Sequence, residues 1–248
     1  MSTPREVADA LTWSLARQSR PKDVLVVGVA TPLAAAAGML ARELLTPDLT
    51  IIMAASVNPK THDVAESLTD PAAAARYAPG TLTQAEILDA IQRGRVTLQF
   101  VSPAEVDAEG RINTNRVGDR RLPGALALPD VAVLVGRLVA YRAGHSPRFL
   151  VPRVQYVTGR AGGVRAIVTD KAEIALEGGP RLLALQPGAT EQEARDGCGF
   201  ELAGTPVENE PLPDDARELL DRVIDPDEVR LLELREGRAG ALERLARR

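Results

Sequence analysis

The sequence has little of several things that other classes of protein depend on. Its 248 residues include one cysteine, Cys198, which excludes an internal disulfide framework and a cysteine-rich metal site. No apolar run approaches the roughly 20 residues that a membrane span needs. The N-terminal stretch carries Glu6 and Asp9 and lacks the apolar core of a secretory leader. We therefore expect a cytoplasmic protein with no membrane partner.

Aromatic residues make up only 3% of the chain, so the core must rest on alanine, valine, leucine and isoleucine. Lysine is also scarce: of the 30 basic residues only Lys22, Lys60 and Lys171 are lysines, and the others are arginines. We interpret the arginine and alanine excess as the coding bias of a GC-rich genome. The net charge of −4 argues against a protein that binds nucleic acid mainly through phosphate contacts. No nucleic-acid partner is expected.

Helix and strand patterns alternate through the first half of the chain. Apolar spacing predicts a helix over residues 5–18, and a β-branched run predicts a buried strand over 24–29. An alanine-rich helix over 33–45 and a second strand over 49–53 follow. This order is typical of an α/β protein in which helices cover a mainly parallel sheet.

The rest of the chain continues this pattern less regularly. Thr83 and Glu86 form a capping box for a helix over 83–93, and a strand is expected over 96–101. Residues 130–139 fit either a strand or a buried helix. Further strands are predicted at 154–156, 166–168, 174–176 and 182–185, a short helix from Thr190, a polar loop over 206–213 and charged helix from 214 onward. We expect one domain over 1–248 with a charged tail over about 230–248, solvated or partner-bound.

Motifs of the common chemistries are absent. The sequence has no phosphate-binding loop, dinucleotide glycine fingerprint, nucleophile elbow or paired-histidine zinc motif, and no metal site is predicted. His62 and His145 are far apart in the sequence, and a structural or surface role is favoured for each. The pairs at 162–163 and 178–179 are interpreted as glycine turns. Cys198 fits a small buried hydrophobe better than a nucleophile.

The loop after the second strand is the best candidate site. Ligands of parallel sheets bind beyond the carboxyl ends of the strands. Ala54 and Ala55 are small enough to leave room for a ligand there, with Val57 and Asn58 beside it. Ser56 could donate a hydrogen bond to a ligand, although no base that would make it a nucleophile is visible. A plain turn before Asn58 is the alternative interpretation of Ser56.

Seven short segments, in order and at family spacing over roughly residues 5–230, resemble the β subunit of family I CoA-transferases of the glutaconate type. They are FVSPAEVDAEGRIN at 100–113, SLTDP at 67–71, RGR at 93–95, LPG at 122–124, residues 149–158, LQPGAT at 185–190 and IDP at 224–226. The resemblance implies the three-layer α/β/α CoA-transferase fold with a mainly parallel sheet. It also implies a heteromer with an α subunit, α2β2 or larger.

Two departures from that family bear on the chemistry. The transferases carry a catalytic glutamate just after the second strand, where this chain has Ala54, and no carboxylate lies between Asp48 and Asp63. Classical transferase chemistry lacks its nucleophile here. The family's glycine-rich loop, an oxyanion or CoA-site loop, begins at Gly124 but continues with Ala125.

The resemblance is strongest to a branch that lost this glutamate. That branch is the two-subunit decarboxylase acting on 3-methylglutaconyl-CoA, in the myxobacterial route to isovaleryl-CoA, and it has a cysteine where we place Ser56. The resemblance implies an acyl-CoA decarboxylase that needs no cofactor, because the substrate is its own electron sink. Ser56 would be the catalytic residue. The alternatives are a CoA-transferase, a ring-opening acyl-CoA hydrolase and a non-catalytic scaffold subunit.

Overall fold

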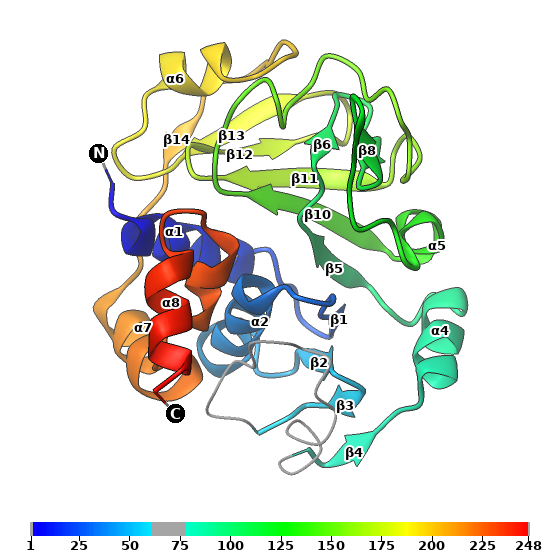
Figure 1. Cartoon of the computed structure of the whole chain (residues 1–248), viewed down its shortest axis with the longest axis vertical. Helices are drawn as coiled ribbons and strands as arrows, with labels where there is room; N and C mark the ends of the chain where they lie inside the picture. Colours follow the sequence, from blue (N-terminus) through cyan, green and yellow to red (C-terminus); the bar gives the residue numbers. More distant parts are fainter. Residues whose placement is uncertain (1, 61–77, 248) are drawn as a thin grey trace. The chain divides into compact units, whose positions relative to one another are not determined.

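The structure, a computed structural model, describes residues 2–60 and 78–247 (Figure 1). Two compact units make up the chain: Met1–Phe100 with Leu212–Arg248, and Val101–Pro211. A single domain over the whole chain stays a prediction. His62 and the segment 67–71, both singled out in the sequence, lie outside the described residues.

The first unit is built on strands in the order β5-β1-β2-β3-β4. Their bounds are β1 Val24–Val26, β2 Thr50–Met53, β3 Ser56–Val57, β4 Gly80–Thr81 and β5 Leu98–Val101. β1 runs parallel to both β2 and β5, as the alternating pattern predicts. β3 and β4 add antiparallel strands at one edge.

β1 is shorter than the predicted strand over 24–29. The backbone of Ala30 is left-handed, with φ 54°, and the Thr31 hydroxyl donates to the Gly28 carbonyl at 2.8 Å. These features turn the chain out of the sheet and into helix α2, Pro32–Leu44. The loop over 27–31 therefore belongs to the edge of the sheet where ligands of parallel sheets bind.

α2 lies against the sheet at short distance because its contact face is made of alanine and glycine. A Cβ atom added at Gly38 would lie 2.6 Å from Leu25 Cδ2, too close for any larger residue without a shift. Residues 32–41 of α2 are buried. Helix α1, Pro4–Ala16, packs on α2 and buries Leu11 and Leu15. Both helices match their predicted ranges within two residues.

The rest of the first unit is helical. α4, Gln84–Gln92, starts at the predicted capping box, in which Thr83 and Glu86 cap each other. The C-terminal elements are α7 Asp214–Leu219, the π-helix η1 Leu220–Ile224, the 3₁₀-helix η2 Val229–Glu233 and α8 Arg238–Leu245. Although the sequence suggested a solvated or partner-bound tail, η2 packs against α2 and α8, and Arg230 is wholly buried. The carboxylates of Asp9 and Asp225, which pair with the Arg230 guanidinium, make this burial of charge tolerable.

The second unit holds strands in the order β14-β13-β12-β11-β10 and two small hairpins. The bounds are β6 Glu105–Val106, β7 Ile112–Asn113, β8 Arg116–Val117, β9 Arg120–Arg121, β10 Arg137–Arg142, β11 Val164–Thr169, β12 Ala172–Ala175, β13 Arg181–Leu185 and β14 Val207–Glu208, with helices α5 Leu128–Leu134 and α6 Glu191–Asp196. Residues 130–139, which fitted either a strand or a buried helix, contain the end of helix α5 and the start of strand β10. α6 begins at the predicted Thr190 cap.

Two predictions for the second unit are wrong. Residues 154–156, which the structure describes, are not a strand, because the Val154 N–H donates to the Asp107 carboxylate at 2.9 Å rather than to a neighbouring strand. The predicted loop over 206–213 contains β14, which pairs in parallel with β13. Over residues 2–60 and 78–247, no helix has the length and apolar character needed to cross a membrane.

Candidate functional site

The carboxyl ends of β1 and β2 lie at the same edge of the first unit's sheet. The two strands are parallel, and the Val27 N–H extends their pairing by donating to the Ile52 carbonyl at 2.9 Å. Beyond this point β1 leads into an exposed loop with Val29, and β2 leads into Ala54 and Ala55. The predicted site loop thus lies at the edge where parallel sheets bind their ligands.

Ala54 and Ala55 form a two-residue hairpin loop between β2 and β3. Both have left-handed backbones, with φ of 48° and 66°. A two-residue loop with two positive φ angles is a type I′ turn, which favours asparagine and glycine. An L-residue with a Cβ atom costs about 1–2 kcal/mol in this conformation. The hairpin is therefore strained where the sequence predicts function, a common property of functional loops.

Asn58 holds the base of this hairpin. Its Oδ1 accepts a hydrogen bond from the Ile51 N–H at 2.8 Å, and its own N–H donates to the Ile51 carbonyl at 2.7 Å. Asn58 has φ 47°, a conformation that asparagine tolerates better than most residues. Its carboxamide oxygen is committed to the backbone of β2, so Asn58 positions the hairpin. Contact between Asn58 and a substrate stays a prediction.

Ser56 is buried, with no exposed surface, and among residues 2–60 and 78–247 its hydroxyl has no hydrogen-bond partner. It lies opposite Met53 in the pairing of β2 with β3, so its side chain shares a face of the sheet with Met53 and Ile51. Ile51 on that face lies near Gly38 of α2. Ser56 therefore lies on the α2 side of the sheet. In the isolated chain it has no surface to offer a ligand.

Val57 shares the other face of the sheet with Ile52, Val26 and Gln99, which lie in register across four strands. Gln99 is 9% exposed, and its Oε1 is buried with no hydrogen-bond partner in the part of the chain that the structure describes. A buried carbonyl oxygen of this kind is costly unless a donor reaches it. The sequence analysis did not single out Gln99. The available signal was one polar residue inside the otherwise apolar strand 96–101.

The second predicted loop lies in the second unit, between β9 and α5. Gly124 has φ 108°, and Leu126 beyond it has φ 47° with a side chain that is 84% exposed. The Ala125 carbonyl accepts from the Leu128 N–H at 2.8 Å, which starts α5. The predicted site residues thus form two groups: residues 54–58 in one hairpin of the first unit, and Gly124 with Ala125 in the second.

The most recognisable motif, at 107–113, is structural. Asp107 is fully buried and accepts hydrogen bonds from the N–H groups of Glu109 and Arg111 and from the Arg111 side chain. Gly110 has φ 73°, and a Cβ atom there would lie 2.6 Å from the Val164 carbonyl oxygen. Asn113 is also fully buried and accepts from two N–H groups of the next turn. These residues hold the β6–β7 hairpin.

The remaining sequence candidates also have structural roles. His145 is engaged at both ring nitrogens, at 2.8 Å from the Thr169 hydroxyl and 2.8 Å from the Ala194 carbonyl, and burial lowers its pKa. Burial raises the pKa of Cys198 to about 11, which makes it a poor nucleophile. The glycine pairs at 162–163 and 178–179 precede strands β11 and β13 and form turns. The described part of the chain brings together no group of three or more metal-ligating side chains.

Comparisons with known proteins agree on the fold. No protein-family model matches the chain. It is similar to the β-type chain of 3-oxoadipate CoA-transferase from Pseudomonas knackmussii, with 28% identity over 77% of this chain and 82% of that protein. It is also similar to a solved variant of the decarboxylase AibA/AibB in which asparagine replaces a cysteine. That match has 30% identity and a TM-score of 0.82, and it covers 92% of this chain and 97% of the other.

Glutaconate coenzyme A-transferase from Acidaminococcus fermentans shares the fold. Its TM-score is 0.79 with 19% identity, over 93% of this chain and 97% of the other. At this identity the match shows the fold alone. Together these similarities confirm the predicted three-layer α/β/α architecture, a large sheet with flanking helices.

Proposed function

We propose, because the chain belongs to the family of CoA-transferase β subunits, that it is the β subunit of a heteromeric acyl-CoA decarboxylase. The proposed reaction converts 3-methylglutaconyl-CoA to 3,3-dimethylacrylyl-CoA and CO2. The partner is an α subunit, by analogy with AibA/AibB, and the assembly is α2β2 or larger. The enzyme would need no cofactor beyond the coenzyme A of its substrate.

One observation supports this choice over a transferase. The hairpin that leaves β2 carries Ala54, where the resemblance places the transferase glutamate, followed by Ala55. A carboxylate there would repel the substrate carboxylate and attack the thioester. Alanine side chains do neither. The two alanines have strained, left-handed backbones. Strain of this kind is often retained in functional loops, and an uncharged loop can act by shaping a pocket.

The reaction balances with the substrate's own bonds. The bond between the carboxylate carbon and C4 breaks and CO2 leaves. The electron pair moves through the C2–C3 double bond onto the thioester oxygen and gives a dienolate. A proton added at C4 restores the conjugated thioester of 3,3-dimethylacrylyl-CoA. The protein must stabilise the dienolate oxygen with hydrogen-bond donors and take the carboxylate out of water.

We propose that Ala54 and Ala55 leave room for the acyl chain. The role of the second unit's loop at Gly124 and Ala125 as an oxyanion or CoA-site loop stays a prediction. A catalytic role for Ser56 stays a prediction. Because Ser56 is enclosed in this structure, we propose that it acts at least through its small volume beneath the hairpin. Solved variants of the decarboxylase AibA/AibB replace a cysteine, and the resemblance places a cysteine of that branch where this chain has Ser56.

The decisive experiment uses the complex of this chain with its α subunit. The complex is incubated with 3-methylglutaconyl-CoA without an acceptor acid, and the CoA esters are followed by mass spectrometry. We expect loss of CO2 with the thioester intact. No reaction until acetate is added, followed by formation of acetyl-CoA, would contradict the decarboxylase and identify a transferase.

A CoA-transferase is the second candidate, because the similar protein from Pseudomonas knackmussii is one. It would need a carboxylate from the α subunit. A scaffold role is the third, because Ser56 is wholly enclosed. Replacing Ala54 by asparagine, which is larger but suits the left-handed backbone of this turn, separates participant from scaffold: a pocket-forming hairpin loses kcat/KM while the complex still assembles, whereas a scaffold keeps its rate.

A further inference from the structure

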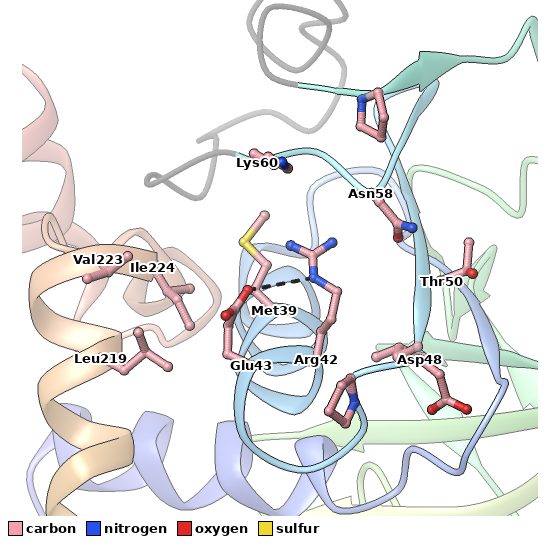
Figure 2. Close-up of a pocket in the computed structure, with 13 residues that line it drawn as sticks. Met39, Arg42, Glu43, Asp48, Thr50, Asn58, Lys60, Leu219, Val223 and Ile224 are labelled. Atoms are coloured by element: carbon pink, nitrogen blue, oxygen red, sulfur yellow. Dashed lines mark ion pairs between the residues drawn. The ribbon is translucent and has the colours of Figure 1, made fainter.

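The charges around the cavity of the first unit balance one another. This cavity, of about 600 Å3, lies between α2 and the C-terminal helices (Figure 2). Arg42 and Lys60 line it together with Glu43 and Asp48, so it presents no net charge to a ligand. The second unit, in contrast, carries a surface on which the charges do not balance.

Basic residues are concentrated in one segment of the second unit. Residues 111–165 contain ten arginines and two acidic residues, Asp119 and Asp130, which gives the segment a net charge of +8. The whole chain carries −4, so the rest of it is strongly acidic. Charge of one sign gathered on one part of a surface attracts a partner of the opposite sign and steers its approach.

The arginine-rich segment forms one continuous surface. We define the basic face as the β8–β9 hairpin, the loop that leads into α5, α5 itself and residues 156–160. The Ile112 N–H donates to the Gly159 carbonyl at 3.0 Å, which holds residues 156–160 beside the strand that leads into β8. A Cβ atom added at Gly159 would lie 3.2 Å from the Cβ atom of Ala132, so α5 borders the same pairing. Figure 1 shows β8 and α5 at the end of this unit that lies away from α6 and β14.

Several arginines of the basic face are exposed and available. Arg120 and Arg121 of β9 and Arg160 are exposed, and none of them forms an ion pair with another residue that the structure describes. Arg116 of β8 pairs with Asp119 at 3.2 Å, but the Asp119 side chain is fully exposed. Exposed pairs of this kind contribute little. These guanidinium groups can therefore bind carboxylates of a partner, which arginine holds through two parallel hydrogen bonds.

Large apolar side chains are exposed on the same face. Besides Leu126 they are Val117, Val133, Tyr156 and Val157, each 40–48% exposed. Leu126 is 84% exposed, and its backbone is left-handed, with φ 47°. This conformation crowds the Cβ atom of any L-residue. The leucine side chain is thus held outward at a conformational cost, and only a partner that covers it would bury its apolar surface.

An apolar centre surrounded by arginines is typical of a protein–protein interface. Such interfaces are enriched in tyrosine and arginine and place polar groups around an apolar core. A nucleotide would use the arginines but would leave most of the apolar side chains of the face uncovered, and contiguous exposed apolar surface marks interaction sites. The loop at Gly124 and Ala125 belongs to the basic face, so a protein bound there would border the loop that the resemblance associates with an oxyanion or CoA site.

We propose that the basic face is the docking surface for the α subunit, which meets it with carboxylates around an apolar centre. Leu126 inserts into that centre, and Arg120, Arg121 and Arg160 pair with the carboxylates. This inference rests on the heteromer of the proposed function and adds the contact surface of this chain and the charge of its partner. It does not depend on which reaction the complex catalyses.

The test measures how tightly the complex of this chain with its α subunit holds together. Sedimentation velocity over a dilution series gives the dissociation constant for the wild type, for Leu126→Asp and for a double variant with Arg120→Gln and Arg121→Gln. We expect each change to weaken the association at least about tenfold, because an apolar anchor or two charge-assisted pairs are lost. The double variant should also lose much of the dependence of the dissociation constant on salt.

Matched controls lie on β13 of the same unit, outside the basic face. Leu183→Asp changes an apolar side chain that is 41% exposed, and Arg181→Gln changes an exposed arginine. Both should associate with the α subunit as tightly as the wild type. Circular dichroism checks that every variant is folded, which we expect because all the substituted side chains are exposed and aspartate tolerates a left-handed backbone better than leucine.

Unchanged dissociation constants for Leu126→Asp and the double variant would overturn the proposal, and so would two other results. If these variants keep the α subunit but an α2β2 complex separates into αβ, a second copy of this chain occupies the face. If they assemble normally but bind adenosine 3′,5′-bisphosphate more weakly in titration calorimetry, the face holds the nucleotide end of coenzyme A. Decarboxylation by the wild type is assayed separately. A complex that assembles through this face without decarboxylating its substrate contradicts the proposed function and leaves the docking surface supported.

Discussion

Two regions of the first unit, the ion cluster around Arg230 and the hairpin at Ala54 and Ala55, differ in how they hold polar groups. Around Arg230 the chain buries full charges and satisfies most of them: the guanidinium lies 2.9 Å from both Asp9 and Asp225. Asp225 also accepts from the N–H groups of Val229 and Arg230, which starts η2. At the hairpin the chain carries no charge, yet two alanines are left-handed and the Ser56 hydroxyl lacks a partner among the described residues.

This contrast indicates which region stabilises the folded protein and which one tolerates backbone strain. The ion cluster joins α1 to the C-terminal helices, far along the chain from the predicted site. Burial raises the pKa of Asp225 although Arg230 lies beside it, so the cluster is favourable only while its partners are all present. The hairpin departs from the ideal residues for its turn, as functional loops often do.

The largest effect should come from breaking the ion cluster. Asp225→Ala leaves the Arg230 guanidinium buried with one carboxylate fewer and removes the acceptor for two N–H groups. We expect the free energy of unfolding to fall by about 3–5 kcal/mol. Urea denaturation of the purified chain measures it. The control is Asp89→Ala, which breaks an exposed ion pair with Arg93 and should cost less than about 1 kcal/mol. Equal losses would show that the cluster has no special role.

The second effect concerns the uncharged hairpin. Ala54→Glu places a carboxylate at the proposed pocket, where it would repel the substrate carboxylate. We expect kcat/KM for decarboxylation to fall about a hundredfold, equivalent to two tenfold steps of about 1.4 kcal/mol. Ala54→Gln, similar in size but uncharged, should lose much less. If the glutamine variant is as slow as the glutamate variant, size rather than charge excludes the substrate.

A smaller effect should come from relieving the hairpin's strain. Ala55→Gly removes the Cβ atom from a residue with φ 66°, so we expect the protein to gain about 1 kcal/mol of stability. Ala35→Gly, in the buried helix α2, is the opposite control and should destabilise the protein by roughly the same amount or more. Thermal unfolding compares them. A loss of stability in Ala55→Gly would contradict the strain assigned to this turn.

The smallest effect is a pH dependence in the second unit. Burial lowers the pKa of His145 below its ordinary value of 6.5, so the unfolded chain binds a proton at a higher pH than the folded chain. The stability contributed by the neutral ring is present above about pH 6.5 and is lost as the pH falls toward the folded pKa. His145→Gln should flatten this part of the curve of unfolding free energy against pH. Parallel curves for both proteins would show that His145 does not titrate with folding.

Local patterns were sufficient for much of the architecture. The capping boxes at Thr83 and Thr190 start helices because a side chain and a backbone N–H three residues away satisfy each other locally. The apolar run of β2 and the alanine-rich α2 were also predictable, since a buried strand and a helix packed closely on a sheet need those residues. The loop after β2 also lies at the carboxyl end of a parallel strand, as predicted; that it binds a ligand stays a prediction.

Only the tertiary structure decided what those residues do. Ser56 is enclosed and the Asn58 carboxamide holds the base of the hairpin, because strand pairing brings residues 51–58 together. Residues 154–156 leave the sheet because Asp107, 47 positions away, takes the N–H of Val154. Arg230 is buried in what the sequence presents as a charged tail, since its carboxylate partner Asp9 lies 221 positions earlier. Such long-range pairings are set by packing, and no local pattern records them.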